Sequence, residues 1–168
     1  IVASGASSSI PHYSSQNKKL RKNTAVLFDV GVKYKEYTAD LSRTIYLGSP
    51  LKKFLRIYAK VLECNELCLK LVKSGTSYVE IHNAAVKFFK KYGLDKYFIH
   101  SIGHGVGLDI HEAPYVKVKN SKKLKENMVI TIEPGLYLPG EFGVRIEDLV
   151  VVGKSKSKVL SSKAAESY

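Results

Sequence analysis

Apolar positions along the chain form short runs first and helical stripes afterwards. Residues 25–28 are a continuous apolar run, which is typical of a strand covered on both faces. A second strand around residues 35–46 would pair with it in a hairpin that turns near residues 34 and 35. Apolar residues then recur at helical spacing over residues 50–75, and a second helix is expected over residues 78–92.

The ends of these helices carry recognisable signals. Gly75 is expected to cap the end of the first helix, and Ser77 with Glu80 forms a capping box for the second, which should stop at Gly93. The pattern then turns to strands and loops, with strands expected over 128–132 and 143–152. Residues 154–168 look like a tail with a last strand fragment. The order of hairpin, helices and strands predicts a single α+β domain over residues 1–168.

The composition is that of an ordinary globular domain. Of 168 residues, 45% are hydrophobic and 25% are charged, which excludes disorder over most of the length. No apolar run approaches the roughly 18 residues of a membrane span, and the first residues are neither basic nor long enough for a secretory signal. We therefore expect a cytoplasmic protein. Because the sequence does not begin with Met, we read it as a piece of a longer one.

Basic residues outnumber acidic ones by 27 to 15, a formal net charge of +12. Such a balance is common in proteins that bind nucleic acid. Here, however, the Lys and Arg residues are scattered along the chain as pairs, without a basic block that is interleaved with aromatic residues. We interpret them as solvated faces and expect neither nucleic acid nor a membrane as a partner.

Three residues of reactive types are expected to be structural. Cys64 and Cys68 lie four positions apart on the first predicted helix, where a buried reduced pair is the expected arrangement. A zinc site would need two more soft ligands nearby in the sequence. His82 lies in the second predicted helix and is likewise interpreted as structural.

Carboxylates appear where strands should be buried. Asp29 directly follows the run 25–28, and a buried carboxylate is costly unless something pairs with it. If the hairpin turns at residues 34 and 35, positions that sum to 69 face each other, which places Asp40 opposite Asp29. Two carboxylates in that position repel, and a bound cation would remove the repulsion. The alternative is that Asp40 is a solvated turn residue.

The second half of the chain repeats this arrangement. Glu133 ends the apolar strand 129–132, and Glu147 lies at a position that faces it across a turn near Gly140, because the two numbers sum to 280. Alternation along the strand puts Arg145 on the same face as Glu147. One such pair also fits an edge strand with a wet face, but two pairs beside apolar sequence favour a metal cluster.

Histidines are concentrated in a glycine-rich segment. His100, His104 and His111 fall within twelve residues, and the glycines at 103, 105 and 107 exclude a helical zinc pair. We expect these glycines to let the backbone approach something bound. Four carboxylates and one imidazole would form a hard, oxygen-rich site that suits two Mn²⁺, Co²⁺, Fe²⁺ or Zn²⁺ ions, which would turn a water molecule between them into a nucleophile.

Five segments in the same order resemble the signatures of the pita-bread-fold metallopeptidases. The closest branch is the Xaa-Pro peptidases, aminopeptidase P and prolidase, because Asp40-Leu41-Ser42-Arg43-Thr44 has the Asp-x-x-Arg-Thr form. The segments are Phe28-Asp29-Val30-Gly31, Tyr37 to Thr44, Gly103 to Glu112, Ile132-Glu133-Pro134-Gly135-Leu136-Tyr137 and Val144-Arg145-Ile146-Glu147-Asp148. The resemblance runs from about residue 1 to about residue 153.

This resemblance implies a site. Five residues would hold two divalent ions, of which Mn²⁺ is favoured, and two of the five, Asp40 and Glu147, would bridge the ions. The five are Asp29, Asp40, His104, Glu133 and Glu147. Glu133 would also move the proton from the attacking water to the leaving nitrogen, and His111 would stabilise the tetrahedral intermediate, with His100 beside them. His12, His100, His111 and Arg145 would contact the substrate.

The resemblance also implies a fold and an activity. The fold would be a curved, mostly antiparallel sheet covered by helices, and the activity would be hydrolysis of the bond between an N-terminal residue and proline. The family's first helices, which precede the part matched here, are missing, and the full-length form is expected to be a homodimer. Methionine aminopeptidase is an alternative that Arg43-Thr44 disfavours. A non-catalytic binding module is disfavoured by the intact ligand set.

Overall fold

The computed structural model describes residues 1–115 and 122–161, and within them it shows the expected order of a hairpin, two helices and further strands. The elements are β1 (Val2–Ser4), η1 (Gly5–Ser9), β2 (Thr24–Tyr34), β3 (Tyr37–Leu47), α1 (Lys52–Leu71), α2 (Tyr78–Lys91), η2 (Asp95–Tyr97), β4 (His104–Gly105), β5 (Glu112–Tyr115), β6 (Val129–Ile132), β7 (Gly135–Leu138), β8 (Phe142–Arg145), β9 (Asp148–Val151) and β10 (Lys158–Val159).

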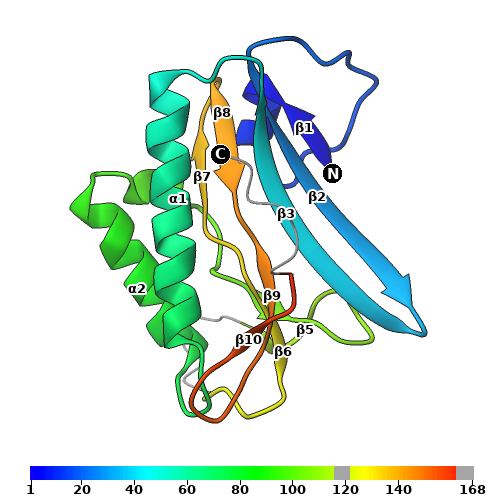
Figure 1. The fold of residues 1–168 in the computed structure, drawn as a ribbon, viewed down its shortest axis with the longest axis vertical. Helices are drawn as coiled ribbons and strands as arrows, with labels where there is room; N and C mark the ends of the chain where they lie inside the picture. The colour runs from blue at the N-terminus through cyan, green and yellow to red at the C-terminus, as the bar shows by residue number, and fades with distance from the viewer. Residues whose placement is uncertain (116–121, 162–168) are drawn as a thin grey trace.

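The strands form three antiparallel sheets with the helices on one side. Their orders are β1-β2-β3, β10-β9-β6-β4-β5 and β7-β8. Helix α1 lies beside β7 and β8 with α2 packed against α1, while the long hairpin of β2 and β3 extends away from the helices (Figure 1). The core fills the space between the helices and the strands, with fully buried Phe54 and Val61 on α1, Phe89 on α2, and Ile132 and Val144 on the strands.

The hairpin is longer and differently registered than expected. Lys35 and Glu36 form its two-residue turn, both with positive φ, and Tyr34 faces Tyr37. Asp29 therefore faces Ser42, and Asp40 faces Gly31, so the prediction that the two aspartates lie directly opposite each other was wrong by two positions. They still share one face of the sheet as diagonal neighbours, a distance that side chains can span.

The first helix ends earlier than its glycine suggested. Helix α1 stops at Leu71 with Val72 as its C-cap, and Gly75 lies in the following turn with φ 92°. The second helix follows its signals. Ser77 accepts a hydrogen bond from the backbone N–H of Glu80, and the Glu80 carboxylate accepts one from the N–H of Ser77, so the capping box is confirmed.

The later strands keep the predicted register. Ile132 faces Asp148 between β6 and β9, and Gly135 faces Arg145 between β7 and β8, so every pair sums to 280. The turn at Gly140 has φ 74°, as this spacing requires. The expected strand 143–152 is divided into β8 and β9, and the break falls at residues 146 and 147. Strand β10 lies in the predicted tail, whose last residues, 162–168, fall outside the described part.

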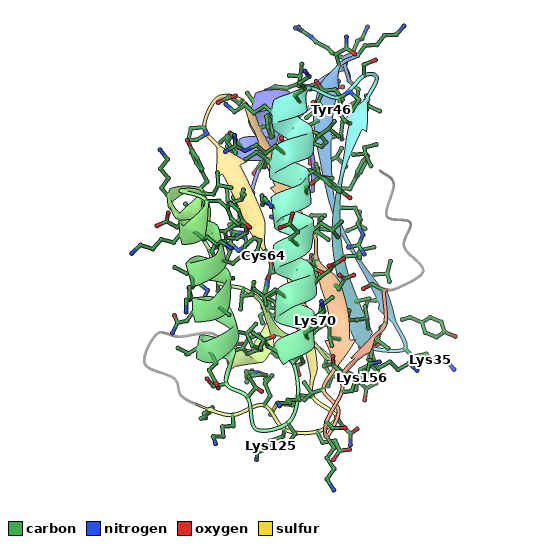
Figure 2. All side chains as sticks on the ribbon, turned by 60° about the vertical axis from the view of Figure 1, so that its left-hand side comes forward. Lys35, Tyr46, Cys64, Lys70, Lys125 and Lys156 are labelled. Atoms are coloured by element: carbon green, nitrogen blue, oxygen red, sulfur yellow. The ribbon has the colours of Figure 1, made fainter. Side chains whose placement is uncertain are left out.

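The residues expected to be structural lie inside the helix layer. Cys64 and Cys68 are free and buried on α1, and the His82 ring packs against Phe98 at 5.4 Å between ring centroids. The lysines behave differently, since Lys35, Lys70, Lys125 and Lys156 are exposed and project from four separate segments (Figure 2). Among the described helices, none combines the length and apolar character that crossing a membrane would take.

Candidate metal centre

The five carboxylate and imidazole groups singled out in the sequence converge in space. Three overlapping groups bring their ligand atoms within 4.8 Å of one another, and the groups are Asp29 with Asp40 and Glu147, His104 with Glu133 and Glu147, and Asp40 with His104 and His111. Asp40, His104 and Glu147 each belong to two groups. Side chains separated by more than a hundred positions in the sequence thus form one continuous cluster.

Each of the four carboxylates stands at a place that the fold fixes. Asp29 and Asp40 come from the inner face of the β2–β3 hairpin, Glu133 follows the last residue of β6, and Glu147 lies in the break between β8 and β9. The Glu147 backbone N–H donates to the Ser42 carbonyl on β3 at 3.0 Å, which holds the break against the hairpin.

Backbone bonds also place the remaining members of the cluster. The Glu133 N–H donates to the Ile102 carbonyl at 2.9 Å, just before the segment that carries His104. The Thr131 hydroxyl accepts from the His104 N–H at 3.0 Å and donates to Glu133 Oε1 at 3.3 Å. One threonine thus ties the imidazole segment to the glutamate.

The acids of the cluster lack enough positive charge to balance them. Burial, reinforced by the negative charge of Asp29, raises the pKa of Asp40 to about 6. Burial raises the pKa of Glu133 to about 7, with Asp40 adding to the effect and Arg145 opposing it. The pKa of Glu147 is raised well above its ordinary value by burial and by the charge of Glu133. Such shifts mark a site at which a cation would be strongly stabilised.

Two carboxylate oxygens have no hydrogen-bond donor among the described residues. They are Asp40 Oδ1 and Glu147 Oε1, and both are buried. A buried oxygen without a partner costs free energy, so its presence in a folded protein calls for a ligand. These two residues are also the ones that the family resemblance assigns to the bridging position between two ions.

The tautomer of His104 suits a metal ligand. Its Nδ1 lies 3.1 Å from the Gly105 carbonyl oxygen, which can only accept, so the proton is on Nδ1. Nε2 then carries a lone pair and points toward Asp40 Oδ2 at 3.7 Å and Glu133 Oε1 at 3.4 Å. Burial lowers the pKa of His104, which keeps the ring neutral. A backbone partner on the far nitrogen is the usual arrangement for a metal-binding histidine.

The donor set therefore fits divalent cations. Four carboxylates supply hard oxygen atoms, one neutral imidazole nitrogen points at them, and two oxygens are unpaired. Oxygen-rich sites with one imidazole suit Mn²⁺, Fe²⁺, Co²⁺ or Zn²⁺. The residues expected from the sequence are thus placed so that they could hold two such ions.

Arg145 is engaged by the protein itself. Its Nη2 donates to Asp29 Oδ2 at 2.6 Å, and its Nε donates to the Ser42 hydroxyl at 2.8 Å, which in turn donates to Glu147 Oε2 at 2.7 Å. Nη1 donates to the Tyr137 hydroxyl at 2.9 Å. The Arg145 side chain, which is 4% exposed, thus orients Asp29 directly and Glu147 through the Ser42 hydroxyl.

His100 is the far end of the same hydrogen-bond chain. Its Nδ1 donates to the Ser101 carbonyl at 2.7 Å, so Nε2 accepts from the Tyr137 hydroxyl at 2.9 Å. Burial lowers the pKa of His100 to about 4, and the ring is neutral near pH 7. Both ring nitrogens are therefore occupied by the protein.

The cluster opens into a cleft of about 410 Å³. Its lining includes His12, His100, His104, His111 and Arg145, together with Glu133, Pro11 and Tyr115. The His111 ring lies 4.2 Å from that of His104, and His111 is exposed. All four residues predicted to contact a substrate, His12, His100, His111 and Arg145, thus line one cavity beside the carboxylates.

The glycines of the histidine segment serve close contacts within the chain. A side chain at Gly103 would meet the Thr131 carbonyl oxygen at 2.1 Å, and one at Gly105 would meet the Ala113 carbonyl oxygen at 2.3 Å. These contacts give both glycines a reason within the chain. Gly103 also lines the cleft, so the expectation that the glycines make room for something bound stays a prediction. They let β4 pass closely between its neighbours.

Several polar residues of the site were not singled out from the sequence. Ser42 and Tyr137 carry hydrogen bonds of Arg145. Arg43, which the sequence indicated only as part of a signature, donates to the Asp148 carboxylate at 2.7 Å and to the Glu147 carbonyl. A signal for Ser42 exists, because Asp40, Ser42 and Thr44 alternate along β3 and all are buried. A run of alternating polar residues on an inward face indicates a polar interior.

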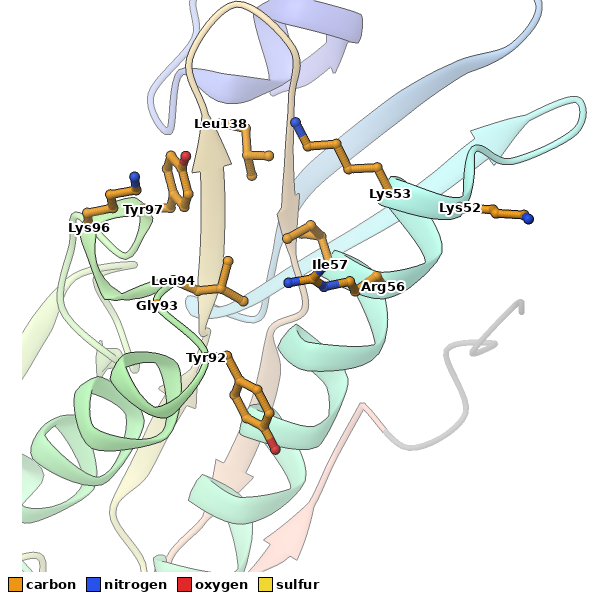
Figure 3. A pocket seen from close by; sticks show the side chains of 10 residues that line it. All are labelled: Lys52, Lys53, Arg56, Ile57, Tyr92, Gly93, Leu94, Lys96, Tyr97 and Leu138. Carbon is orange, nitrogen blue, oxygen red and sulfur yellow. The ribbon is translucent and has the colours of Figure 1, made fainter.

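A second cavity lies away from the carboxylates. It has a volume of about 420 Å³ between the start of α1 and the segment after α2, and it is lined by Lys53, Arg56, Leu94, Tyr97 and Leu138 among others (Figure 3). Lys53 is paired there with Glu141 at 2.6 Å. No carboxylate or imidazole is among its lining residues, so it does not share the donor set of the first cleft.

Comparison with known proteins agrees with this geometry. The chain matches the model of metallopeptidase family M24 over residues 1–154. It is 43% identical over 166 residues to an Xaa-Pro dipeptidase of Pyrococcus furiosus, covering 99% of this chain and 48% of that protein. A second Xaa-Pro dipeptidase, of Pyrococcus horikoshii, is 42% identical with 99% and 47% coverage. The chain spans about half the length of these curated relatives.

Solved structures of two such peptidases superimpose on the chain. The prolidase from Pyrococcus furiosus gives a TM-score of 0.93 at 43% identity, covering 96% of this chain and 48% of that one. An X-Pro aminopeptidase from Thermotoga maritima gives 0.93 at 37% identity, with 96% and 46% coverage. The chain thus belongs to metallopeptidase family M24 and has the pita-bread fold.

Proposed function

We propose that the protein is a metal-dependent exopeptidase that hydrolyses the bond between an N-terminal residue and a following proline. The observation that carries the proposal is the convergence of four carboxylates and His104 within one cluster at the floor of a cleft. The printed names of the relatives, Xaa-Pro dipeptidase and X-Pro aminopeptidase, support the choice of substrate.

Two ions would be held by Asp29, Asp40, His104, Glu133 and Glu147, with Asp40 and Glu147 between them. The membership of both bridging residues in two of the three groups supports this assignment. His104 also belongs to two groups, but it offers a single free nitrogen and so cannot bridge. Bound divalent ions would lower the pKa of a water molecule and polarise the scissile carbonyl. Mn²⁺ is the metal that we favour.

The chain's own side chains would handle the proton and the developing charge. Glu133 lines the cleft with its Oε1 3.4 Å from His104 Nε2, so it is placed to accept a proton from the attacking water at one carboxylate oxygen and to release it to the leaving nitrogen. His111 is exposed at the wall of the cleft, where its ring could donate to the oxyanion. His12 would contact the substrate on the same wall.

The contacts of His100 and Arg145 support a different role from direct proton transfer. Both ring nitrogens of His100 and most donors of Arg145 are bound within the protein. We infer that Arg145 holds Asp29 and that His100 closes the hydrogen-bond chain, while their surfaces shape the cleft. A role of either in substrate binding stays a prediction.

The test is a metal analysis combined with a panel of peptides. The protein should contain two divalent ions per chain and should cleave Ala-Pro peptides, and excess chelator followed by dialysis should abolish this cleavage until Mn²⁺ is restored. Cleavage that persists without metal would rule out the proposal. Two-residue and longer Ala-Pro peptides would show whether the protein is a dipeptidase or an aminopeptidase.

A methionine aminopeptidase with the same metals is the alternative within the fold. It predicts faster cleavage of Met-Ala than of Ala-Pro, so the same panel distinguishes the two. A cytoplasmic location and a homodimeric full-length form stay predictions, which fractionation of cells and the molar mass in solution would test.

A further inference from the structure

Each of the two helices carries a polar side chain that is buried in the apolar core. Asn65 on α1 is 2% exposed and Tyr78 on α2 is also 2% exposed. Their neighbours in the core are mostly apolar, so each polar group needs a partner inside the protein. The partners they find lie beside the residues of the metal cluster.

Asn65 joins the two segments that carry the glutamates. Its amide nitrogen donates to the Ile132 carbonyl at 3.2 Å and to the Ile146 carbonyl at 3.3 Å. Ile132 directly precedes Glu133, and Ile146 directly precedes Glu147. One side-chain amide therefore fixes the separation of the two backbone positions from which both carboxylates project.

Tyr78 fixes the backbone segment that carries the imidazole of His104. Its hydroxyl lies 3.0 Å from the His104 carbonyl oxygen and 3.0 Å from the Thr131 carbonyl oxygen, and its single proton can be donated to either. Thr131 in turn accepts from the His104 N–H and donates to Glu133. The hydroxyl thus holds the segment of His104 beside the strand that leads to Glu133.

We propose that Asn65 and Tyr78 are positioning residues of the metal centre, through which the two helices set the spacing of His104, Glu133 and Glu147. Both side chains act on backbone carbonyls and not on the ligand atoms: Tyr78 bonds the carbonyl of His104 or Thr131, and Asn65 bonds the carbonyls directly before Glu133 and Glu147. This inference rests on the proposed metal centre and adds to it a role for the helix layer.

Asn65 and Tyr78 also satisfy buried carbonyls, so losing either polar group should lower stability in any case. Metal affinity is the property that a positioning role changes and a merely structural role leaves unchanged. Outer partners that orient metal ligands usually change metal affinity by about 10- to 100-fold when they are lost. A loss of that size is what the proposal predicts here.

The experiment uses Asn65→Leu and Tyr78→Phe, which remove the polar atoms and keep the bulk. Tyr46→Phe is the matched control for the tyrosine, because the Tyr46 hydroxyl also donates from the core to a carbonyl, that of Asn23 at 3.0 Å, but far from the cluster. Cys64→Ala is the control for α1, since it truncates another fully buried side chain of that helix and removes no hydrogen bond to the segments of the cluster.

Mn²⁺ alone is titrated into each metal-free protein by calorimetry, and unfolding by urea is measured in parallel. We expect Asn65→Leu and Tyr78→Phe to weaken Mn²⁺ binding about 10-fold or more, while Tyr46→Phe and Cys64→Ala lower stability and leave Mn²⁺ affinity unchanged. Unchanged affinity in the first two variants, or an equal loss in the controls, overturns the inference. A wild type that binds no Mn²⁺ would instead overturn the proposed metal centre.

Discussion

At the scale of single residues, the protein gathers more buried negative charge than the positive groups described around it balance. Asp40, Glu133 and Glu147 share one buried cluster in which Arg145 is the main positive group. The sequence indicated these residues because carboxylates next to apolar strands are uncommon without a partner. It could not indicate Ser42 or Tyr137 as the partners of Arg145, because a hydroxyl in a strand can bond to backbone, side chains or water, and the sequence does not show which.

Asp40→Asn should abolish peptidase activity and leave the fold intact. The change removes one proposed ligand of both ions, so kcat/KM on an Ala-Pro peptide should fall by more than about 100-fold, beyond the usual cost of losing an outer partner. It also removes a charge that repels Asp29, so the metal-free protein should be at least as stable as wild type in urea. Asp95→Asn, in η2, should change neither quantity, and wild-type activity of the Asp40 variant would contradict the assignment.

The stability contributed by Glu133 should depend on pH in the metal-free protein. Its folded pKa of about 7 is raised above the ordinary 4.5, so the fold binds the proton more tightly than the unfolded chain does. The associated stability is present below about pH 4.5 and is lost as the pH rises through about 7. Glu133→Gln removes this dependence.

Urea unfolding in chelator at pH 5 and pH 8 tests this expectation. The free energy of unfolding of Glu133→Gln, taken relative to that of wild type, should be roughly 2 to 3 kcal/mol higher at pH 8 than at pH 5. The comparison between the two proteins cancels the titration of groups whose surroundings do not include Glu133, such as the half-buried His82. An advantage of the variant that is the same at both pH values would contradict a raised pKa.

At the scale of elements, local signals predicted the existence of helices and strands better than their register. The capping box of α2 follows from residues at the start of that helix. The pairing of β6 with β9 and of β7 with β8, in which facing residue numbers sum to 280, follows from the turn near Gly140. The register of the first hairpin has no such local signal, because its turn uses Lys35 and Glu36 with positive φ. Glycine or asparagine would have revealed such a turn, whereas lysine and glutamate do not.

Ser77→Ala should destabilise the protein by about 1 kcal/mol, the usual cost of losing an N-cap side chain. The variant leaves the N–H of Glu80 without its partner at the start of α2. Chemical denaturation measures the loss. Ser74→Ala, three residues earlier in the turn, should have a smaller effect, and equal effects of the two would argue that the cap contributes little.

At the scale of the whole molecule, the cluster exists only when both halves are folded together. Asp29 and Asp40 come from the hairpin, whereas His104, Glu133 and Glu147 come from the part after the helices. An unfolded chain cannot gather these ligands, so the proposed ions should bind the native state almost exclusively.

Mn²⁺ should therefore stabilise the fold in proportion to its occupancy. At a free concentration 100 times Kd, binding at one site adds about 2.7 kcal/mol to the free energy of unfolding. Thermal or urea unfolding with and without Mn²⁺ measures the gain. The gain should be much smaller in Asp40→Asn, and a wild-type protein that Mn²⁺ leaves unaffected would contradict a native metal centre.

The sequence by itself indicated the carboxylates and histidines that converge and the segments that become helices or strands, because both follow from residue types and their local spacing. Only the tertiary structure decided that Asp29 and Asp40 are diagonal neighbours, that Arg145 holds carboxylates, and that Asn65 and Tyr78 reach the carbonyls beside the proposed ligands. These contacts join residues far apart in the chain, and the geometry of a single turn or the packing of a helix on a strand sets them. No local pattern records such distances.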